Sequence, residues 1–330
     1  MHRILSFLLL LSTCYIADAQ VDKRDTTNYT VKIKIPTEWI EKIRHFNYTR
    51  NTTGLLKEFD HFIRPDSLVN PHAKHVNRGY GRVLSALFVD LDGQPGDELI
   101  CLLGWDVNCP YLSVFKEKQG NWYLIYLEEI ESFYSSPALC VANCFSPNKT
   151  FYCRRVYNHG SGEYADGYSF YKLINNKVYK CLNLLNKAEI INPGPYMSQA
   201  IKMDFEFSGD DQDGIWVNYN YNFYNVPWEK DDSLPVANEG IPLIKGEGGT
   251  NYTWNKKSLT YDLDMLPFQN ELEDLTAEKI ACFGEVWKNT LFVRAFQRQI
   301  DEMLKTGTPQ QKMVLKEYLA QVEKDQGKLY

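Results

Sequence analysis

The sequence predicts a mainly β protein that ends in a helical hairpin, and three observations predict this fold class. From about residue 80 to residue 265, short apolar runs alternate with turn residues, a rhythm typical of antiparallel meanders. The 22 Tyr, 17 Phe and 7 Trp agree with this rhythm, because aromatic side chains favour half-buried pleated surfaces. Residues 274–326 instead repeat their apolar residues at helical spacing.

The N-terminus has the features of a secretory signal peptide over residues 1–19. Arg3 precedes an apolar run, and Ala17-Asp18-Ala19 fits a small-residue cleavage site. An alternative makes Cys14 a lipidated anchor, but Thr13 fits the lipobox poorly. No segment approaches the roughly 18 apolar residues of a transmembrane helix. We therefore expect an exported protein, secreted, periplasmic or at the cell surface, with soluble release favoured.

Residues 20–79 predict one strand and two short helices ahead of the β region. Val31, Ile33 and Ile35 alternate with lysines, as in a strand with one wet face. Thr37 is the expected N-cap of a first helix, and residues 55–62 form the second. Residues 64–79 are polar and irregular, which indicates a boundary.

Residues 80–265 form the predicted β-meander domain, with turns at residues 118–121 and at Asn175-Asn176. The strand near residues 216–224 alternates Tyr and Asn, so its Tyr face is expected to pack inward. Residues 228–258 are rich in Gly, Pro, Asp and Asn and predict a long excursion without regular structure.

The C-terminal segment, residues 274–326, predicts an αα-hairpin packed on the β domain. A first helix is expected up to about residue 305, with Gly307 at its C′ position. Thr308 and Gln311 have the spacing of a capping box for the second helix.

Seven cysteines remain after cleavage, and in an oxidising compartment most of them should pair. Their spacing does not fix the connectivity, and one thiol must be left over, for which Cys282 is our candidate because it lies on a remote helix. Paired Cys-x-x-Cys knuckles that would indicate zinc are absent. The seven are Cys101, Cys109, Cys140, Cys144, Cys153, Cys181 and Cys282.

An acidic loop between two apolar runs, residues 89–101, is the most distinctive motif. Carboxylates this close repel one another, so the loop needs a cation, backbone donors or full exposure to water. It is not an EF-hand loop, because Pro95 stands where that motif requires Gly.

This loop, with the downstream hairpin and Trp122, resembles the FG-GAP or VCBS-like repeat of integrin-type β-propeller blades over about residues 80–130. The resemblance implies an incomplete or degenerate propeller, because about 40 to 45 residues per blade allow about four blades at most in residues 80–265, and a curved stack of meanders is the equal alternative. It also implies a calcium site. The residues carried over as candidate ligands are Asp90, Asp92, Gln94, the Gly96 carbonyl, Asp97 and Glu98.

Gln94 stands where the family places Asp, and the loss of one negative charge weakens calcium binding. A purely structural turn is therefore the favoured interpretation. A second acidic cluster, residues 208–216, is interpreted as a solvated Asx-type turn, with a degraded copy of the first turn or a sialidase-like Asp-box as alternatives.

The net charge of −6 argues against nucleic-acid binding, which requires a basic surface. No assembled catalytic motif is visible, and Gly-x-Ser-x-Gly is absent. We therefore expect a non-catalytic binding or surface-assembly protein whose partner is a protein or a glycan. The alternative is a secreted glycan-acting hydrolase, because acidic and aromatic residues are plentiful and two of the acids could form the carboxylate pair that cleaves a glycosidic bond.

Overall fold

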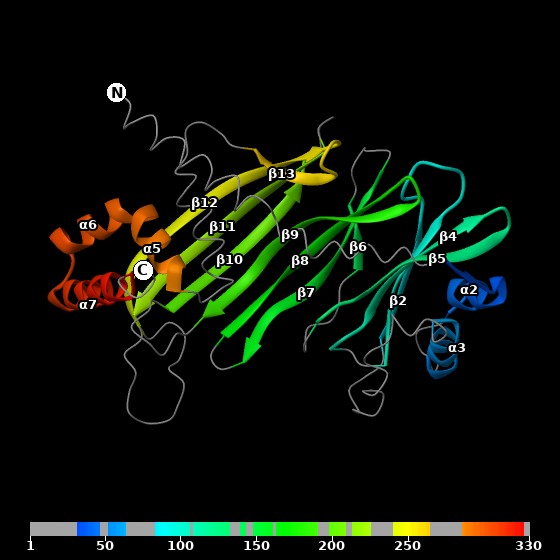
Figure 1. The fold of residues 1–330 in the computed structure, drawn as a ribbon, viewed down its shortest axis with the longest axis horizontal. Coiled ribbons are helices and arrows are strands. Elements are labelled where there is room, and N and C mark those ends of the chain that lie inside the picture. Colours follow the sequence, from blue (N-terminus) through cyan, green and yellow to red (C-terminus); the bar gives the residue numbers. More distant parts are fainter. Residues whose placement is uncertain are drawn as a thin grey trace.

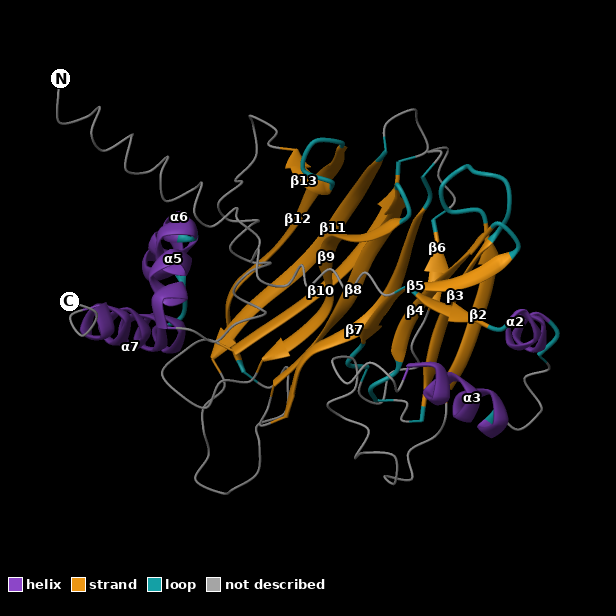
Figure 2. Cartoon of the chain, turned by 45° about the vertical axis from the view of Figure 1, so that its right-hand side comes forward, coloured by secondary structure: helices purple, strands orange, loops and turns teal. Residues whose placement is uncertain are grey.

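The computed structural model describes residues 32–46, 52–63, 83–105, 108–132, 139–142, 148–160, 163–190, 198–208, 213–225, 240–264 and 286–326. The expected signal peptide, Cys14, residues 64–79, Cys144 and Cys282 lie outside these residues. Within them the prediction of a mainly β fold is confirmed, with two antiparallel sheets and a C-terminal helical region. Figure 2 shows how far strands dominate the chain.

The first sheet has five strands in the order β1-β5-β4-β3-β2, so β2 to β5 form the expected meander. Gln119 and Gly120 in the β4–β5 turn have φ of 54° and 74°, the left-handed conformation of a two-residue hairpin turn. The strands are β1 (Ile33–Ile35), β2 (Val83–Val89), β3 (Glu98–Gly104), β4 (Tyr111–Lys118) and β5 (Asn121–Glu129).

Two helices, α2 (Thr37–Arg44) and α3 (Thr53–Ile63), cover one face of this sheet. The indole of Trp39 stacks on Phe59 and contacts Phe115 from β4, and its Nε1 donates to the Leu55 carbonyl at 3.1 Å. The expected N-cap was wrong by one residue. Pro36 precedes the helix without a side-chain cap, and its carbonyl accepts the Trp39 N–H instead.

The second sheet is one continuous sheet of eight strands in the order β13-β12-β11-β10-β9-β8-β7-β6. Asn175 and Asn176, at the predicted β8–β9 turn, both have positive φ, of 52° and 62°. The strands are β6 (Leu139–Val141), β7 (Thr150–Gly160), β8 (Glu163–Ile174), β9 (Lys177–Ile190), β10 (Ser198–Phe207), β11 (Gly214–Asn225), β12 (Ile241–Asn255) and β13 (Thr260–Asp264).

Strand β12 corrects the expectation of a long excursion over residues 228–258. Residues 241–255 pair with both β11 and β13 in spite of their Gly-rich sequence. One of these glycines is required in the strand, because the ring of Tyr221 occupies the space that a side chain at Gly246 would need. A Cβ on Gly246 would lie 2.3 Å from the hydroxyl oxygen of Tyr221. Composition indicated a loop, and cross-strand packing overrode it.

Strand β11 has the predicted alternation. Val217, Tyr219, Tyr221 and Phe223 are buried in the largest core, whereas Asn218 and Asn220 are exposed. The C-terminal helices close this core from one side, through Phe292, Phe296 and Tyr318 among others. Figure 1 shows these helices at one end of the molecule and α2 and α3 at the other.

The predicted first C-terminal helix is divided in two within its described part. Helices α5 (Val286–Ala295) and α6 (Gln297–Thr306) meet at the fully buried Phe296, and α7 (Pro309–Gln326) follows. Gly307 was expected at a C′ position, where glycine usually has a left-handed conformation. Its φ is −63°, so it does not have that conformation. Its lack of a side chain lets its N–H reach the Met303 carbonyl at 2.9 Å, where a Cβ would lie 2.6 Å from that oxygen.

The capping box of α7 is confirmed. The Thr308 Oγ1 accepts the Gln311 N–H at 3.2 Å, and the Gln311 Oε1 accepts the Thr308 N–H at 2.9 Å. Among the helices within the described ranges, none is long and apolar enough to span a bilayer.

The two sheets pack against each other through a separate core. Ile100 and Leu112 of the first sheet and Phe151 and Tyr171 of the second are all fully buried there. The eight-stranded sheet also curls, since its edge strand β13 contacts β9, four positions away in the strand order. It keeps two edges, β13 and β6, and is rolled without closing into a barrel.

No disulfide joins any of the five cysteines that the structure describes. Cys101, Cys153 and Cys181 are buried in three different cores, which places their thiols among apolar side chains and away from one another. Burial raises the pKa of the Cys153 and Cys181 thiols to about 12. The expected pairing is therefore not seen among these residues.

Candidate functional site

The acidic turn joins two adjacent antiparallel strands, as the sequence predicts. Val89 at the end of β2 pairs with Glu98 at the start of β3. Gly93 and Gly96 have φ of 71° and 108°, a conformation that favours glycine. Residues 93–97 form the exposed tip.

Backbone N–H groups of the turn satisfy one oxygen on each of three carboxylates. Asp90 Oδ1 accepts the Gly93 N–H at 2.7 Å, and Asp92 Oδ1 accepts the Gln94 N–H at 3.2 Å. Glu98 Oε2 accepts the N–H of the buried Leu91 at 2.8 Å. These hydrogen bonds orient each carboxylate without the help of a cation.

A lysine from the neighbouring strand supplies the positive charge. Lys116 of β4 places its Nζ 2.5 Å from Asp92 Oδ2 and 2.9 Å from Glu98 Oε1. The Asp92 and Glu98 side chains are only 7% and 3% exposed, so the ion pairs lie in a region of low dielectric constant. Burial lowers the pKa of Lys116, but the hydrogen bonds to the two carboxylates outweigh burial and raise the pKa above its usual value.

Of the four carboxylates among the predicted calcium ligands, three come together in the turn. One oxygen each from Asp90, Asp92 and Glu98 lie within 4.8 Å of one another, and such oxygens are the ligands that calcium prefers. Asp97 does not belong to this group and is exposed at the tip, as are Gln94 and Gly96.

The donor set of the turn therefore suits a hard cation only in part. Calcium takes six to eight oxygen ligands, and the ammonium of Lys116 already bonds to two of the three carboxylates. A calcium ion at this position would have to displace Lys116. The sequence analysis missed this lysine because it is 24 residues away from Asp92, and only the register of β3 and β4 brings it to the turn.

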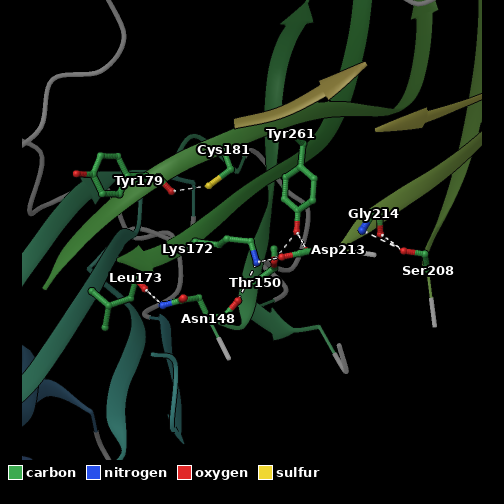
Figure 3. A network of polar contacts seen from close by, with 10 residues as sticks. All are labelled: Asn148, Thr150, Lys172, Leu173, Tyr179, Cys181, Ser208, Asp213, Gly214 and Tyr261. Atoms are coloured by element: carbon green, nitrogen blue, oxygen red, sulfur yellow. Dashed lines mark hydrogen bonds and ion pairs between the residues drawn. The ribbon is translucent and has the colours of Figure 1, made fainter. Parts of the chain in front are cut away.

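A second polar cluster lies inside the curl of the eight-stranded sheet, and Figure 3 shows its hydrogen-bonded members, among them Lys172, Asp213 and Tyr261. Lys172 of β8 is 0% exposed. Its Nζ donates to Asp213 Oδ2 and to the Asn148 carbonyl, both at 2.7 Å, and lies 5.1 Å from the ring centre of Trp254. The buried ammonium thus has an anion, a carbonyl and an aromatic face around it.

Tyr261 of the edge strand β13 completes this cluster. Its hydroxyl donates to Asp213 Oδ1 at 2.6 Å and lies 2.7 Å from Thr150 Oγ1 on β7. Burial raises the pKa of Tyr261 well above its usual value, and the nearby charge of Asp213 adds to this. The hydrogen bonds of the cluster thereby connect β13, β8 and β7 to Asp213, the residue that precedes β11.

Asp213 corrects the interpretation of the second acidic cluster. Its side chain is 15% exposed and is bonded to Lys172 and Tyr261, so at this residue the turn is not simply solvated. Residues 209–212 lie outside the described residues. In the sequence, this cluster could have been found from Lys172, because a lysine between apolar residues at an inward-facing strand position needs a buried partner for its charge.

A third cluster surrounds Glu128 between the two sheets. Its carboxylate accepts hydrogen bonds from the hydroxyls of Tyr126 at 2.7 Å and Tyr171 at 2.8 Å. Lys180 Nζ lies 2.5 Å away and Arg155 3.5 Å away. Burial raises the pKa of Glu128, but the charge of Lys180 and its hydrogen bond lower it by more, so the pKa is below its usual value.

No model of a known protein family, no curated protein and no solved structure matches this chain.

Proposed function

We propose that this chain is an exported, non-catalytic binding or surface-assembly protein. In this proposal the FG-GAP-like acidic turn is a structural bend neutralised by Lys116, and calcium is a weak competitor for the same carboxylates.

One observation carries the proposal. Five buried or nearly buried carboxylates are each paired with a lysine or arginine from another strand or turn. A catalytic acid or base needs a carboxyl group that faces the substrate and exchanges a proton with it. Carboxylates held in this way stabilise the arrangement of strands instead. The five are Asp92, Glu98, Glu128, Asp166 and Asp213.

Lys116 supports the assignment of the turn as structural. A buried carboxylate without a partner is costly, and an intramolecular ammonium removes that cost without any dependence on free calcium. The resemblance to FG-GAP repeats fits this assignment in geometry, because the turn occupies the same place between two adjacent strands of a meander.

The test is a thermal melting curve of the wild type and of Lys116→Met, each with excess calcium and with a chelator. We expect the wild-type midpoint to stay the same in both conditions. Lys116→Met should melt lower with chelator and recover part of the loss with calcium, because a ligand that binds the native state alone raises the midpoint.

Lys118→Met is the matched control, since Lys118 lies two residues further along β4 and is exposed. It should match the wild type in both conditions. A wild-type midpoint that rises by about 5 °C or more with calcium would show that the metal displaces Lys116 and would contradict the structural-bend assignment.

The alternative, a secreted glycan-acting hydrolase, makes a different prediction. It requires release of reducing ends from a polysaccharide and loss of that release on substitution of a single acid. Activity in the wild type that disappears in one Asp→Asn or Glu→Gln variant would overturn the proposal of a non-catalytic protein.

A further inference from the structure

One face of β11 carries a row of polar and aromatic side chains with no aliphatic member. Side chains at every second position of a strand share a face, so Trp216, Asn218, Asn220, Asn222 and Tyr224 form this row. At about 3.3 Å per residue the row is roughly 26 Å long. The opposite face of β11 is the Tyr and Phe face that is buried in the core.

The two ends of the row differ in exposure. Trp216 is 46% exposed, although large aromatic side chains are usually buried, and Asn218 and Asn220 are exposed beside it. Tyr224 at the other end is 1% exposed, as is Ser198, its cross-strand partner on β10. Cross-strand partners point to the same face, so Ser198 belongs to this surface.

Three buried polar atoms at the closed end have no hydrogen-bond partner among the residues that the structure describes. They are Ser198 Oγ, Asn222 Oδ1 and Tyr224 OH. Buried polar atoms in proteins are almost always hydrogen-bonded, because an unpaired one loses its water without compensation. Three such atoms on two neighbouring strands indicate a place where hydroxyl groups from outside the protein are bound.

The charges near the row favour a neutral ligand. The row itself has no ionisable group other than the phenol of Tyr224. On β10 the flanking exposed residues are Lys202, Asp204 and Glu206, and on β12 they are Lys245 and Glu247, so the signs are mixed. An anionic or cationic polymer would meet like charges, whereas an uncharged ligand would not.

From these observations we infer that this surface, the Trp216–Tyr224 row with Ser198, binds a neutral glycan chain. The indole of Trp216 offers a flat apolar face for a sugar ring, and the amides of Asn218 and Asn220 exchange hydrogen bonds with its hydroxyls. The hydroxyls of Ser198 and Tyr224 and the amide of Asn222 are buried in the free protein, so this end of the surface must open before they receive the end of the chain. This inference rests on the proposed binding function and names its ligand class.

Affinity electrophoresis tests the inference with gels that contain a soluble neutral polysaccharide. The neutral probes are hydroxyethyl cellulose, xylan, galactomannan and dextran, and the acidic probe is alginate. We expect at least one neutral probe to retard the wild type and alginate not to retard it. Trp216→Ala should weaken the retardation by about fivefold or more, because ring stacking is lost.

Met313→Ala is the matched control for Trp216→Ala. Met313, on α7, is 54% exposed and is not a member of the row. It should bind like the wild type. Absence of retardation by every neutral probe, retardation by alginate alone, or equal binding by Trp216→Ala would each overturn the inference.

Tyr224→Phe separates a glycan from a buried water. If a glycan hydroxyl satisfies the phenol, the variant should bind about threefold more weakly or worse, and its stability without glycan should be unchanged or higher. The control is Tyr171→Phe, whose hydroxyl bonds to Glu128, and it should lose stability while it keeps the binding. A Tyr224→Phe variant that loses stability and binds normally would show that a water satisfies the site and would overturn the inference.

The same samples distinguish the failure of this inference from the failure of the proposed function. Release of reducing ends from a bound probe would contradict the non-catalytic function and leave the glycan surface in place. Absence of binding to all neutral probes would contradict the glycan surface and leave the binding or assembly function in place.

Discussion

The ammonium of Lys180, on β9, lies 2.5 Å from the carboxylate of Glu128, on β5, and so joins the two sheets by an ion pair. The pair lies beside the apolar core that the sheets share, and the Lys180 and Glu128 side chains are 14% and 16% exposed. Two tyrosine hydroxyls also donate to Glu128. Glu128 is therefore the polar centre of the contact between the sheets.

Glu128→Gln should lower the free energy of unfolding by about 2 kcal/mol, because it leaves Lys180 without its anion in a largely buried place. Urea denaturation at neutral pH measures this. Glu117→Gln, at an exposed position on β4, is the control and should have no effect beyond about 0.5 kcal/mol. An unchanged urea midpoint in Glu128→Gln would show that the inter-sheet ion pair adds nothing.

The acid side of the stability curve should depend on Glu128. Its folded-state pKa lies below its unfolded value, so its contribution is present at pH values above the unfolded pKa and is lost as the pH falls through the folded one. The free energy of unfolding should therefore fall between about pH 5 and pH 3. Glu128→Gln should show a shallower fall in the same denaturation series, and an identical slope would contradict this.

The alkaline side should depend on Lys116. Its folded-state pKa is raised, so its contribution is complete below the unfolded pKa and is lost as the pH rises through the folded one. Melting curves above about pH 10 should show a loss of stability that is smaller in Lys116→Met. Equal alkaline slopes in the two proteins would show that Lys116 is not held as charged by Asp92 and Glu98.

Strand β12 can be tested through its glycines. Gly246→Ala should lower the free energy of unfolding by about 1 to 3 kcal/mol, because the new methyl group collides with the ring of Tyr221. Gly54→Ala, in helix α3, has no atom within 4 Å of its added Cβ and should raise stability by about 0.5 kcal/mol. The two variants make the same chemical change, and opposite signs in urea denaturation are the expected result.

The buried thiols should be unreactive in the native protein. Burial raises the pKa of Cys153 and Cys181, so little of the reactive thiolate exists at neutral pH. Titration with Ellman's reagent should leave these two cysteines unlabelled until denaturant is added, as peptide mapping can check. If they remain unlabelled in denaturant and react only after reduction, they are in disulfides, as the sequence analysis expected.

The sequence alone determined the local structure where a short-range signal was strong. The β4–β5 turn, the Asn175-Asn176 turn, the alternation along β11 and the capping box of α7 are set by residues within a few positions of one another. It also located the acidic bend between two neighbouring strands. Near neighbours decide these features because turn chemistry, strand periodicity and helix capping act over a few residues.

Tertiary structure alone decided what surrounds each charge. Lys116 reaches the acidic turn through the pairing of β3 with β4, and Lys172 meets Asp213 because the eight-stranded sheet curls. The strand at residues 241–255 likewise depends on the ring of Tyr221, which requires Gly246. These contacts join residues far apart in the chain, and their energies depend on burial. A one-dimensional pattern contains neither the distance nor the burial.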